Sequence, residues 1–283
     1  MTDAVLVLGG TGKTARHLVP LLREAGEPVR TAARSGADVV FDWDDPSTHG
    51  PALDGVGRMY LVPPAFDLGF APAVTAFLDR AQAAGVRHVT FLSASGVEHA
   101  PPETALRAVE LDLAARSGLT HAVLRPAWFM QNFSEGSFAP MVADGVLALP
   151  AGDGAEAFVD TRDIAAAAAA TLRDPAAHDG AAYVLSGPEA LTFTEVAAAL
   201  SGAAGREVRY APTTTAEFVG AMVGAGLPPA YAGMLGGLLA MISSGGGTPP
   251  TTGVADATGR APRGFADWAA DAARAGAWGG VPV

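Results

Sequence analysis

The chain of 283 residues contains no cysteine and a single lysine, Lys13. The absence of cysteine excludes disulfides, thiolate metal ligands and a cysteine nucleophile. The single lysine excludes a Schiff base away from its own position. It also excludes a Tyr-x-x-x-Lys catalytic pair, because no lysine stands four residues after any tyrosine (Tyr60, Tyr183, Tyr210, Tyr231). Several common catalytic mechanisms are therefore closed to this chain.

Charge is also scarce, and it is mostly negative. Charged residues make up 17% of the chain, hydrophobic residues 49%, and the formal net charge is −11. This balance supplies a core and argues against disorder, and the acidic surface argues against a nucleic-acid partner. No secretory signal opens the chain, and the apolar stretch 233–242 is too short and glycine-rich to span a bilayer. We therefore expect a soluble, cytoplasmic protein without a membrane partner.

The sequence also lacks other catalytic patterns. No histidine-rich or carboxylate cluster has metal-ligand spacing, and no Gly-x-Ser-x-Gly elbow occurs. The acidic run Asp42, Asp44 and Asp45 is more simply a solvated turn. We therefore predict no metal site.

The stretch 5–17 carries the strongest positive signal. An apolar run ends at Gly9-Gly10, and a helical pattern follows almost at once. A strand, a tight glycine turn and a helix start gather unpaired backbone N–H groups and the positive end of the helix dipole, which attract phosphate. Glycine allows the turn and lets phosphate approach the backbone.

Two phosphate-binding motifs compete for this stretch. Gly12-Lys13-Thr14 resembles the end of a P-loop, but that motif needs a glycine where Val7 stands. The spacing Gly-x-x-Gly-x-x-Gly/Ala is filled by Gly9, Gly12 and Ala15, and a small third residue lets helix and strand pack closely. The sequence therefore predicts a dinucleotide site.

Strand and helix patterns alternate over roughly the first 125 residues. Strands are predicted at 5–8, 28–33, 38–41, 58–62, 88–92 and 120–124, with helices at 14–24, 71–84 and 104–117. Alternation of this kind predicts an α/β fold, a Rossmann-type doubly wound parallel sheet with ligands outside the carboxyl ends of its strands. We assign residues 1–126 to this NAD(P)-binding domain.

Residues 127–283 show a looser pattern. Strands are predicted at 145–149, 157–159, 182–186 and 206–210, and helices at 161–172, from 192 with a capping-box spacing, over 214–242 and over 264–275. A glycine- and proline-rich link is expected at 243–252. We interpret this half as a smaller substrate-side subdomain that is interleaved with the sheet and partly returns to it.

The end of the second predicted strand bears on the choice of dinucleotide. An acidic residue there would bind the ribose 2′-hydroxyl of NAD, whereas this chain has Arg34 beside Ser35. A guanidinium group suits a 2′-phosphate, and Lys13 supplies a second cation nearby. We therefore predict NADP(H) as the cofactor.

Several short stretches together resemble a known family. Residues 9–14 (GGTGKT), 41–43 (FDW), 61–64 (LVPP) and 124–133 (LRPAWFMQNF) are similar to motifs at these places in the NmrA-like atypical short-chain dehydrogenases/reductases. The resemblance is greatest to bacterial relatives of the ergot-alkaloid reductases of the festuclavine/agroclavine type. It covers most of the chain and weakens after about Thr213. It implies a monomeric or dimeric Rossmann-fold protein that binds NADP(H).

Carried over by position, the resemblance implies roles for individual residues. It implies phosphate contacts from the glycine loop, a 2′-phosphate contact from Arg34, a border to the adenine, contacts to the ribose side and a border to the nicotinamide. The corresponding residues are Gly9, Thr11, Gly12, Lys13 and Thr14 for the phosphates, Asp42 and Trp43 for the adenine, Val62, Pro63 and Ser93 for the ribose, and Pro126 and Trp128 for the nicotinamide. Trp43 and Trp128 are equally well interpreted as core aromatics.

The absence of a tyrosine–lysine pair, which this branch shares, favours hydride transfer to a substrate that is already electrophilic: an iminium ion, a quinone or a conjugated carbonyl. Ser95 is the candidate to hydrogen-bond a substrate oxygen, with a turn residue as the alternative, and His99 is more simply an exposed loop residue. Glu110, common in these proteins, is present, but Ala105 and Leu106 stand where relatives often have a polar residue.

Three functions remain open at this level. The first is an NADPH-dependent reductase of a small hydrophobic or cationic molecule, in keeping with a role in secondary metabolism. The second is a non-catalytic NADP(H) sensor that regulates a partner protein. The third is a redox-neutral cyclase or isomerase in which the dinucleotide is structural. A fold alone does not choose among such functions.

Overall fold

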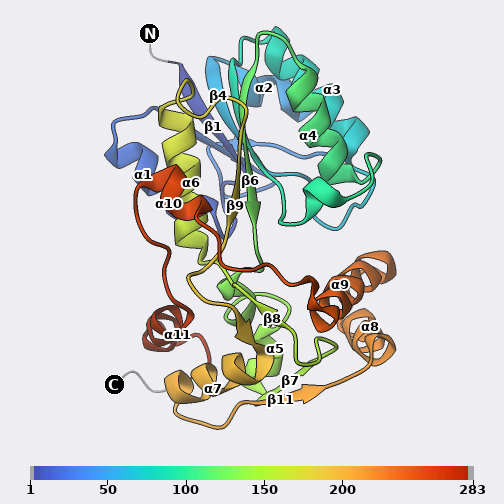
Figure 1. Cartoon of the computed structure of the whole chain (residues 1–283). Helices are drawn as coiled ribbons and strands as arrows, with labels where there is room; N and C mark the ends of the chain where they lie inside the picture. The colour runs from blue at the N-terminus through green and yellow to red at the C-terminus, as the bar shows by residue number, and fades with distance from the viewer. Residues whose placement is uncertain (1–2, 280–283) are drawn as a thin grey trace. The chain divides into compact units, whose positions relative to one another are not determined.

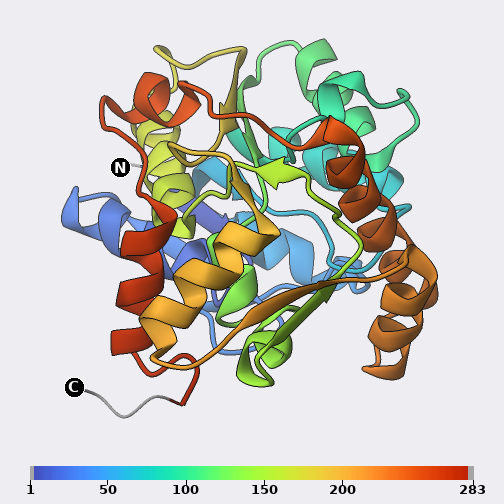
Figure 2. The same ribbon diagram turned by 60° about the horizontal axis from the view of Figure 1, so that its bottom comes forward.

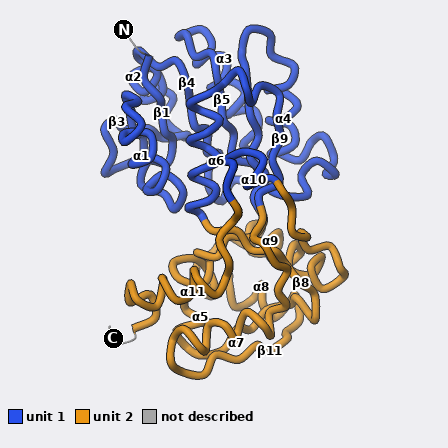
Figure 3. The backbone as a smooth tube through the Cα atoms, turned by 60° about the vertical axis from the view of Figure 1, so that its left-hand side comes forward, with its two compact units in different colours: residues 1–126, 161–185, 253–260 blue, residues 127–160, 186–252, 261–283 orange. Residues whose placement is uncertain are grey.

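The computed structural model describes residues 3–279, and Figure 1 labels its helices and strands. The chain forms two compact units, coloured separately in Figure 3. Unit 1 contains residues 1–126, 161–185 and 253–260, and unit 2 contains residues 127–160, 186–252 and 261–283. Two stretches of the second half, 161–185 and 253–260, thus belong to the unit that the first 126 residues begin.

Unit 1 is built on a seven-stranded sheet in which every neighbouring pair is parallel. Its strands are β1 (Ala4–Leu8), β2 (Val29–Ala33), β3 (Val39–Val40), β4 (Val56–Leu61), β5 (His88–Leu92), β6 (Thr120–Pro126) and β9 (Ala181–Leu185). The strand order is β3-β2-β1-β4-β5-β6-β9, so the chain reverses its direction of travel across the sheet between β1 and β4. The predicted Rossmann-type sheet is confirmed.

Helices cover both faces of this sheet. They are α1 (Ala15–Glu24), α2 (His49–Leu53), α3 (Ala71–Ala83), α4 (Ala105–Ala115), α6 (Thr161–Arg173) and α10 (Gly253–Thr258), with the 3₁₀ turns η1 (Pro46–Thr48) and η2 (Val97–His99). Figure 1 shows α1, α6 and α10 on one face and α2, α3 and α4 on the other. Parallel sheets need both faces covered, and this arrangement buries apolar strands such as β1 almost completely.

Small residues bring two of the covering elements close to their neighbours. Helix α6 carries six consecutive alanines, of which Ala165, Ala167 and Ala168 are fully buried. At the start of α10, a Cβ added to Gly253 would lie 2.1 Å from the carbonyl oxygen of Val184 in β9. Only glycine permits that approach, so α10 is held against the edge strand by contact between backbones.

Unit 2 combines two small sheets with helices, visible in Figure 2. β7 (Val146–Leu149) pairs in parallel with β11 (Arg209–Pro212), and β8 (Ala155–Glu156) pairs antiparallel with β10 (Leu191–Thr192). Its helices are η3 (Met130–Phe133), α5 (Ala139–Ala143), α7 (Phe193–Ala204), α8 (Thr215–Gly224), α9 (Pro229–Met241), the π-helical turn η4 (Ile242–Gly246) and α11 (Phe265–Arg274). Helix α7 packs beside α11, and α8 packs beside α9.

Aromatic side chains form the centre of unit 2. Phe133 contacts Phe138, Phe158 and Phe265 at ring-centroid distances of 5.3–5.6 Å. These rings are at most 2% exposed, and their tilted and edge-on arrangements are the preferred geometries of aromatic pairs. A core of its own explains why unit 2 forms a separate compact unit.

Helix caps follow the sequence pattern closely. Thr192 and Glu195 form the predicted capping box at the start of α7, and Thr214 and Glu217 form a second one at the start of α8. In each box the threonine hydroxyl accepts the backbone N–H of the glutamate, while the glutamate carboxylate accepts the backbone N–H of the threonine. Two backbone N–H groups at the start of each helix, those of the threonine and of the glutamate, are thereby hydrogen-bonded.

The helices predicted over 214–242 are present as α8 and α9, which are separated by Gly226, with a φ of +96°, and by Pro228. Other predictions for the second half were wrong in detail. The strand predicted at 157–159 lies earlier, at β8, and only a single bridge joins Phe129 to Val159. The strand predicted at 206–210 runs instead over β11. The predicted link 243–252 begins with the π-helical turn η4, and α10 follows it without having been anticipated.

Within residues 3–279, no helix combines the length and the apolar character that crossing a membrane requires.

Candidate functional site

The residues predicted to bind the cofactor in unit 1 follow the carboxyl ends of parallel strands. Gly9 follows β1, Arg34 follows β2, Val62 follows β4 and Ser93 follows β5, while Pro126 is the last residue of β6. Because neighbouring strands are parallel and in register, these positions lie at one edge of the sheet. The reversal between β1 and β4 falls within this edge, where open α/β sheets bind their ligands.

The glycine loop has the geometry that a phosphate cradle requires. Gly9 has a φ of +63°, and the N–H of Gly12 donates to the carbonyl oxygen of Gly9 over 2.7 Å. A Cβ added to Gly10 would lie 2.7 Å from Cβ of Thr31, so the loop presses directly on β2. Helix α1 then begins at Ala15 without a side-chain cap at Thr14. The tight turn and the helix start fit a pyrophosphate group.

Two other predicted phosphate residues differ in their environments. Thr11 is exposed, as a group facing a ligand would be. Thr14 is only 5% exposed, and its hydroxyl accepts a 3.2 Å hydrogen bond from the Tyr60 hydroxyl. The Thr14 side chain therefore joins the glycine loop to β4 through Tyr60, a contact that its place in the motif did not predict. Lys13 is half-buried at the same loop.

Arg34 stands exposed immediately after β2, and within the range 3–279 no carboxylate forms a salt bridge with it. The turn that follows is fixed by Asp38, whose carboxylate accepts the backbone N–H and the hydroxyl of Thr31, both over 2.8 Å. Those hydrogen bonds lower the pKa of Asp38. A fixed turn with an available guanidinium group fits the 2′-phosphate of NADP(H).

The residues predicted to border the adenine belong to an aromatic cluster. Trp43 packs edge-on against Phe41 and Phe77, with ring centroids 5.0 and 5.3 Å apart. Asp42 caps its own turn, since its Oδ1 accepts the N–H of Asp44 over 3.1 Å and its carbonyl oxygen contacts His49 Nε2 over 2.9 Å. Trp43 is half-buried: its indole packs against the aromatic cluster, and part of its surface remains accessible to solvent.

Ser93 is tied to a buried ion pair. Its hydroxyl donates to Glu110 Oε1 over 2.6 Å, and the same carboxylate accepts two bonds from Arg125 and one from Arg107. Burial opposes the charge on Glu110, but these donors outweigh it and lower its pKa. The Ser93 hydroxyl proton is thus committed to Glu110. Sequence reasoning found Glu110 only through the family resemblance and missed both arginines, which are remote in sequence from Ser93.

The proposed catalytic residue Ser95 lies in the turn after β5. Its backbone N–H donates to the carbonyl oxygen of Pro126 over 3.0 Å, and Gly96 beyond it has a φ of +82°. The turn is therefore fixed against β6, with Ser95 only partly buried. His99 is exposed at the end of η2, in agreement with its interpretation as a loop residue.

Trp128 lies in unit 2, where its indole stacks on Phe138 with ring centroids 5.7 Å apart and planes 18° from parallel. Its backbone N–H donates to Oε1 of Glu156 over 3.3 Å. Glu156 is 1% exposed and had no place in the sequence-based prediction. Its two-residue strand is too short to show a pattern, so no sequence signal marked it.

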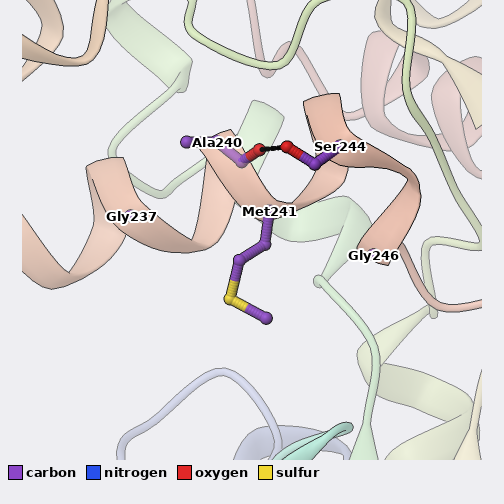
Figure 4. Close-up of a pocket in the computed structure, with 5 residues that line it drawn as sticks. All are labelled: Gly237, Ala240, Met241, Ser244 and Gly246. Carbon is purple, nitrogen blue, oxygen red and sulfur yellow. Dashed lines mark hydrogen bonds between the residues drawn. The ribbon is translucent and has the colours of Figure 1, made fainter.

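A shallow cavity of about 360 Å³, widely open to solvent, lies on the last turns of α9 and on η4, where Met241 is 56% exposed. Its lining is uncharged: Gly237, Ala240, Met241, Ser244 and Gly246. Figure 4 shows the Met241 side chain extending away from the helix, while the Ser244 hydroxyl donates to the carbonyl oxygen of Ala240 over 3.1 Å. Because its proton is used in this bond, Ser244 offers a bound molecule only an acceptor.

Three of the four tyrosine hydroxyls form hydrogen bonds with partners other than lysine. Tyr60 donates to Thr14 and is fully buried, Tyr183 bonds to Nδ1 of His178 over 2.7 Å, and Tyr210 donates to the carbonyl oxygen of Leu149 over 3.1 Å. Desolvation raises the pKa of each of these three phenols. In the described part of the chain, no group of three or more His, Asp or Glu side chains is arranged to hold a metal ion.

Known proteins resemble the chain over nearly its full length. Agroclavine dehydrogenase of Claviceps fusiformis is 36% identical over 283 residues, covering 94% of this chain and 96% of the relative. The NAD(P)H azoreductase of Xenophilus azovorans is 34% identical, with 94% and 96% covered. Among solved structures, the NADPH-dependent quinone oxidoreductase of Escherichia coli, complexed with NADPH, superposes with a TM-score of 0.79 at 26% identity, covering 94% of this chain and 99% of that one.

The model of the NmrA-like family matches residues 1–238, well over half of the chain. The match spans the glycine loop, the whole of β1 to β6, and the segments of unit 2 that carry Trp128 and Glu156. The resemblance inferred from short motifs is therefore confirmed over a continuous stretch. The chain belongs to the NmrA-like family.

Proposed function

We propose that the chain reduces a small electrophilic substrate with hydride from NADPH. Its relatives over nearly the whole length are named a dehydrogenase, an NAD(P)H azoreductase and an NADPH-dependent quinone oxidoreductase. The chain is accordingly an NAD(P)H-dependent oxidoreductase, and NADP(H) is its cofactor. What remains to be proposed is which residues hold the cofactor and which chemical class of substrate is reduced.

The carboxyl edge of the sheet in unit 1 supports the placement of the cofactor. We assign the pyrophosphate to the loop of Gly9, Thr11, Gly12 and Lys13, where backbone N–H groups and the start of α1 favour negative charge. We assign the 2′-phosphate to Arg34, the adenine side to Asp42 and Trp43, and the ribose side to Val62, Pro63 and the segment of Ser93. Pro126 and Trp128 are assigned to the nicotinamide.

The absence of a Tyr-x-x-x-Lys pair from the sequence is the observation that carries the proposed substrate class. The only lysine stands in the glycine loop, and the hydroxyls of Tyr60, Tyr183 and Tyr210 are bonded elsewhere. When bound, NADPH supplies a hydride. An iminium carbon accepts that hydride without a proton, because the hydride neutralises its charge. A quinone or conjugated carbonyl needs a proton as well, which solvent would supply, directly or relayed through the Ser95 hydroxyl.

The cavity on α9 and η4 supports an apolar substrate. Its volume of about 360 Å³ is enough for a small molecule, and because the cavity is open to solvent a bound ring would keep one face exposed. The uncharged lining suits a flat hydrophobic ring, and the acceptor at Ser244 suits a donor or a positive charge on that ring. We therefore favour cyclic iminium ions and quinones with fused rings over small aliphatic carbonyls.

Purified protein tests the proposal directly. NADPH oxidation is followed against a panel of cyclic iminium ions, quinones and enones, with NADH in parallel. We expect turnover of at least one fused-ring compound and a preference for NADPH. Tight NADPH binding with no turnover would favour a sensor that regulates a partner protein instead. Conversion of a substrate without net NADPH oxidation would favour a redox-neutral cyclase or isomerase.

A further inference from the structure

Glu156 is a buried carboxylate without a cationic partner in the described part of the chain. It stands in β8, is 1% exposed, and is held by hydrogen bonds rather than by a salt bridge. Burial raises its pKa, and the hydrogen bonds oppose this shift only in part. Because an uncompensated buried charge is costly, a residue of this kind needs an explanation beyond packing.

The two carboxylate oxygens hold two segments that are distant in sequence. Oε1 accepts the backbone N–H of Trp128 over 3.3 Å, and Oε2 accepts the backbone N–H of Thr248 over 2.7 Å. The first donor is 28 residues away in sequence and the second is 92 residues away. All three residues belong to unit 2. One side chain therefore joins the segment of Trp128 to the segment that follows η4.

The segment on the Thr248 side is also held by glycines at close contact. A Cβ added to Gly154 would lie 2.0 Å from the carbonyl oxygen of Ile242, and one added to Gly247 would lie 2.0 Å from that of Ala155. The N–H of Ala157 donates to the carbonyl oxygen of Thr248 over 2.9 Å. The turn η4, which lines the cavity, therefore packs closely against the start of β8 and the residue before it, through Ile242 at one end and Gly247 at the other.

We propose that Glu156 is a positioning residue: its carboxylate fixes the backbone of Trp128 to the segment that carries the cavity, so that both keep one geometry during hydride transfer. The inference rests on the proposed function, in which Trp128 borders the nicotinamide and the cavity takes the substrate. Glu156 itself touches neither the reacting atoms nor, in this scheme, the cofactor.

The substitution E156Q tests this role with little change of shape. An amide has one acceptor oxygen, so its NH₂ group faces one of the two backbone N–H donors and that link is lost. We expect kcat to fall about 10- to 100-fold, since small misplacements of reacting groups have effects of this size. The dissociation constant for NADPH should change little, and the primary isotope effect with NADPH deuterated at the transferred position should rise because hydride transfer becomes rate-limiting.

A second variant and a control separate positioning from stability. In G247A the added Cβ would lie 2.0 Å from the carbonyl oxygen of Ala155, which should push the neighbouring Thr248 away from Glu156. This variant should therefore give the same loss of kcat. E195Q removes a carboxylate that also accepts a backbone N–H in unit 2 but lies in the exposed capping box of α7, and it should leave kcat unchanged. An unchanged kcat and isotope effect in folded E156Q would overturn the proposal. So would an equal loss in E195Q.

A binding measurement keeps the inference separate from the proposed function. The emission of Trp128, isolated by subtracting the spectrum of W128F, is recorded with and without NADP⁺. We expect contact quenching of Trp128 by the oxidised nicotinamide in the parent protein and a clear reduction of that quenching in E156Q at saturating NADP⁺, because such quenching requires the two rings to touch. If no substrate is turned over, the proposed function fails, but this readout still decides the role of Glu156. Equal quenching in both proteins would contradict it.

Discussion

Arg125 binds Glu110 through two nitrogens, with Nε 3.0 Å from Oε1 and Nη2 2.8 Å from Oε2. The pair joins β6 to α4 beside the carboxyl ends of β5 and β6, and Glu110 is only 4% exposed. A forked guanidinium–carboxylate pair of this kind is geometrically specific. It fixes α4 to β6 next to Ser93, whose hydroxyl donates to the same carboxylate over 2.6 Å.

Removing one member of this pair should be costly. In E110A, Arg125 and Arg107 lose their shared carboxylate, and breaking a buried pair typically costs about 3–5 kcal/mol. Urea unfolding of the parent and the variant measures the difference. D271A breaks an exposed pair with Arg274 in α11 and should have little effect. A loss in E110A as small as that in D271A would show that the pair contributes no net stability.

We expect the cofactor preference to depend on Arg34. Hydrogen bonds to a charged group contribute ~1.5–3 kcal/mol, so R34A should raise the dissociation constant for NADPH about 10- to 100-fold. The constant for NADH should change little, because its ribose carries no phosphate. Fluorescence titration gives both values. Arg87 is an exposed arginine at the opposite edge of the sheet, and R87A should change neither. Equal weakening of NADPH and NADH in R34A would contradict the assignment.

His88 makes the stability of unit 1 sensitive to acid. Its ring bonds to hydroxyls of Thr120 and Thr90 over 2.9 and 3.2 Å, and burial lowers its pKa to about 4. An unfolded chain binds this proton near pH 6.5, so the unfolded state takes it up first as the pH falls. Stability is therefore retained above about pH 6.5 and is lost between there and pH 4, by up to about 3 kcal/mol.

The measurement compares urea midpoints at neutral and acid pH. H88Q should show a smaller acid loss than the parent, because the glutamine does not titrate. His99 is exposed, and H99Q should keep the parent's pH dependence. Carboxylates contribute to both curves and cancel in the comparison. An unchanged pH dependence in H88Q would mean that His88 is not the group responsible.

Gly10 should be intolerant of a side chain. In G10A the new Cβ would lie 2.7 Å from Cβ of Thr31, and overpacking of this kind costs ~1–3 kcal/mol. The loop should also move away from β2 and bind NADPH more weakly. Gly50 in α2 has no atom within 4 Å of an added Cβ, so G50A should be neutral or should stabilise by ~0.4–1 kcal/mol. Thermal unfolding and NADPH titration of both variants decide the matter.

The sequence indicated the parts of the fold in which local pattern and tertiary role agree. The β1 run, the glycine turn and the alternation of strands with helices predicted the sheet, because a buried parallel strand is apolar along its length. The capping box at Thr192 was visible because both partners lie within three residues. Arg34 could be singled out because the end of the second strand has a known place in this fold.

Contacts between distant residues were not predictable in this way. Glu156 meets Thr248 across 92 residues, and Arg125 meets Glu110 from another element, so no local pattern marks either pair. The hydrogen bond that the Thr14 side chain accepts from Tyr60, 46 residues away, was not predicted either. The place of the break between α8 and α9 was not assigned within 214–242, because the apolar pattern continues through Gly226 and Pro228.

Unit 1 is assembled from three separate stretches of the chain, and this sets the order in which it can be completed during synthesis. A ribosome that has passed Pro126 has made six of the seven strands, but the edge strand β9 and the helices α6 and α10 have not yet emerged. Until Gly253 meets Val184, one face of the sheet lacks part of its cover. A fragment ending at residue 126 should therefore aggregate, although it contains the entire glycine loop.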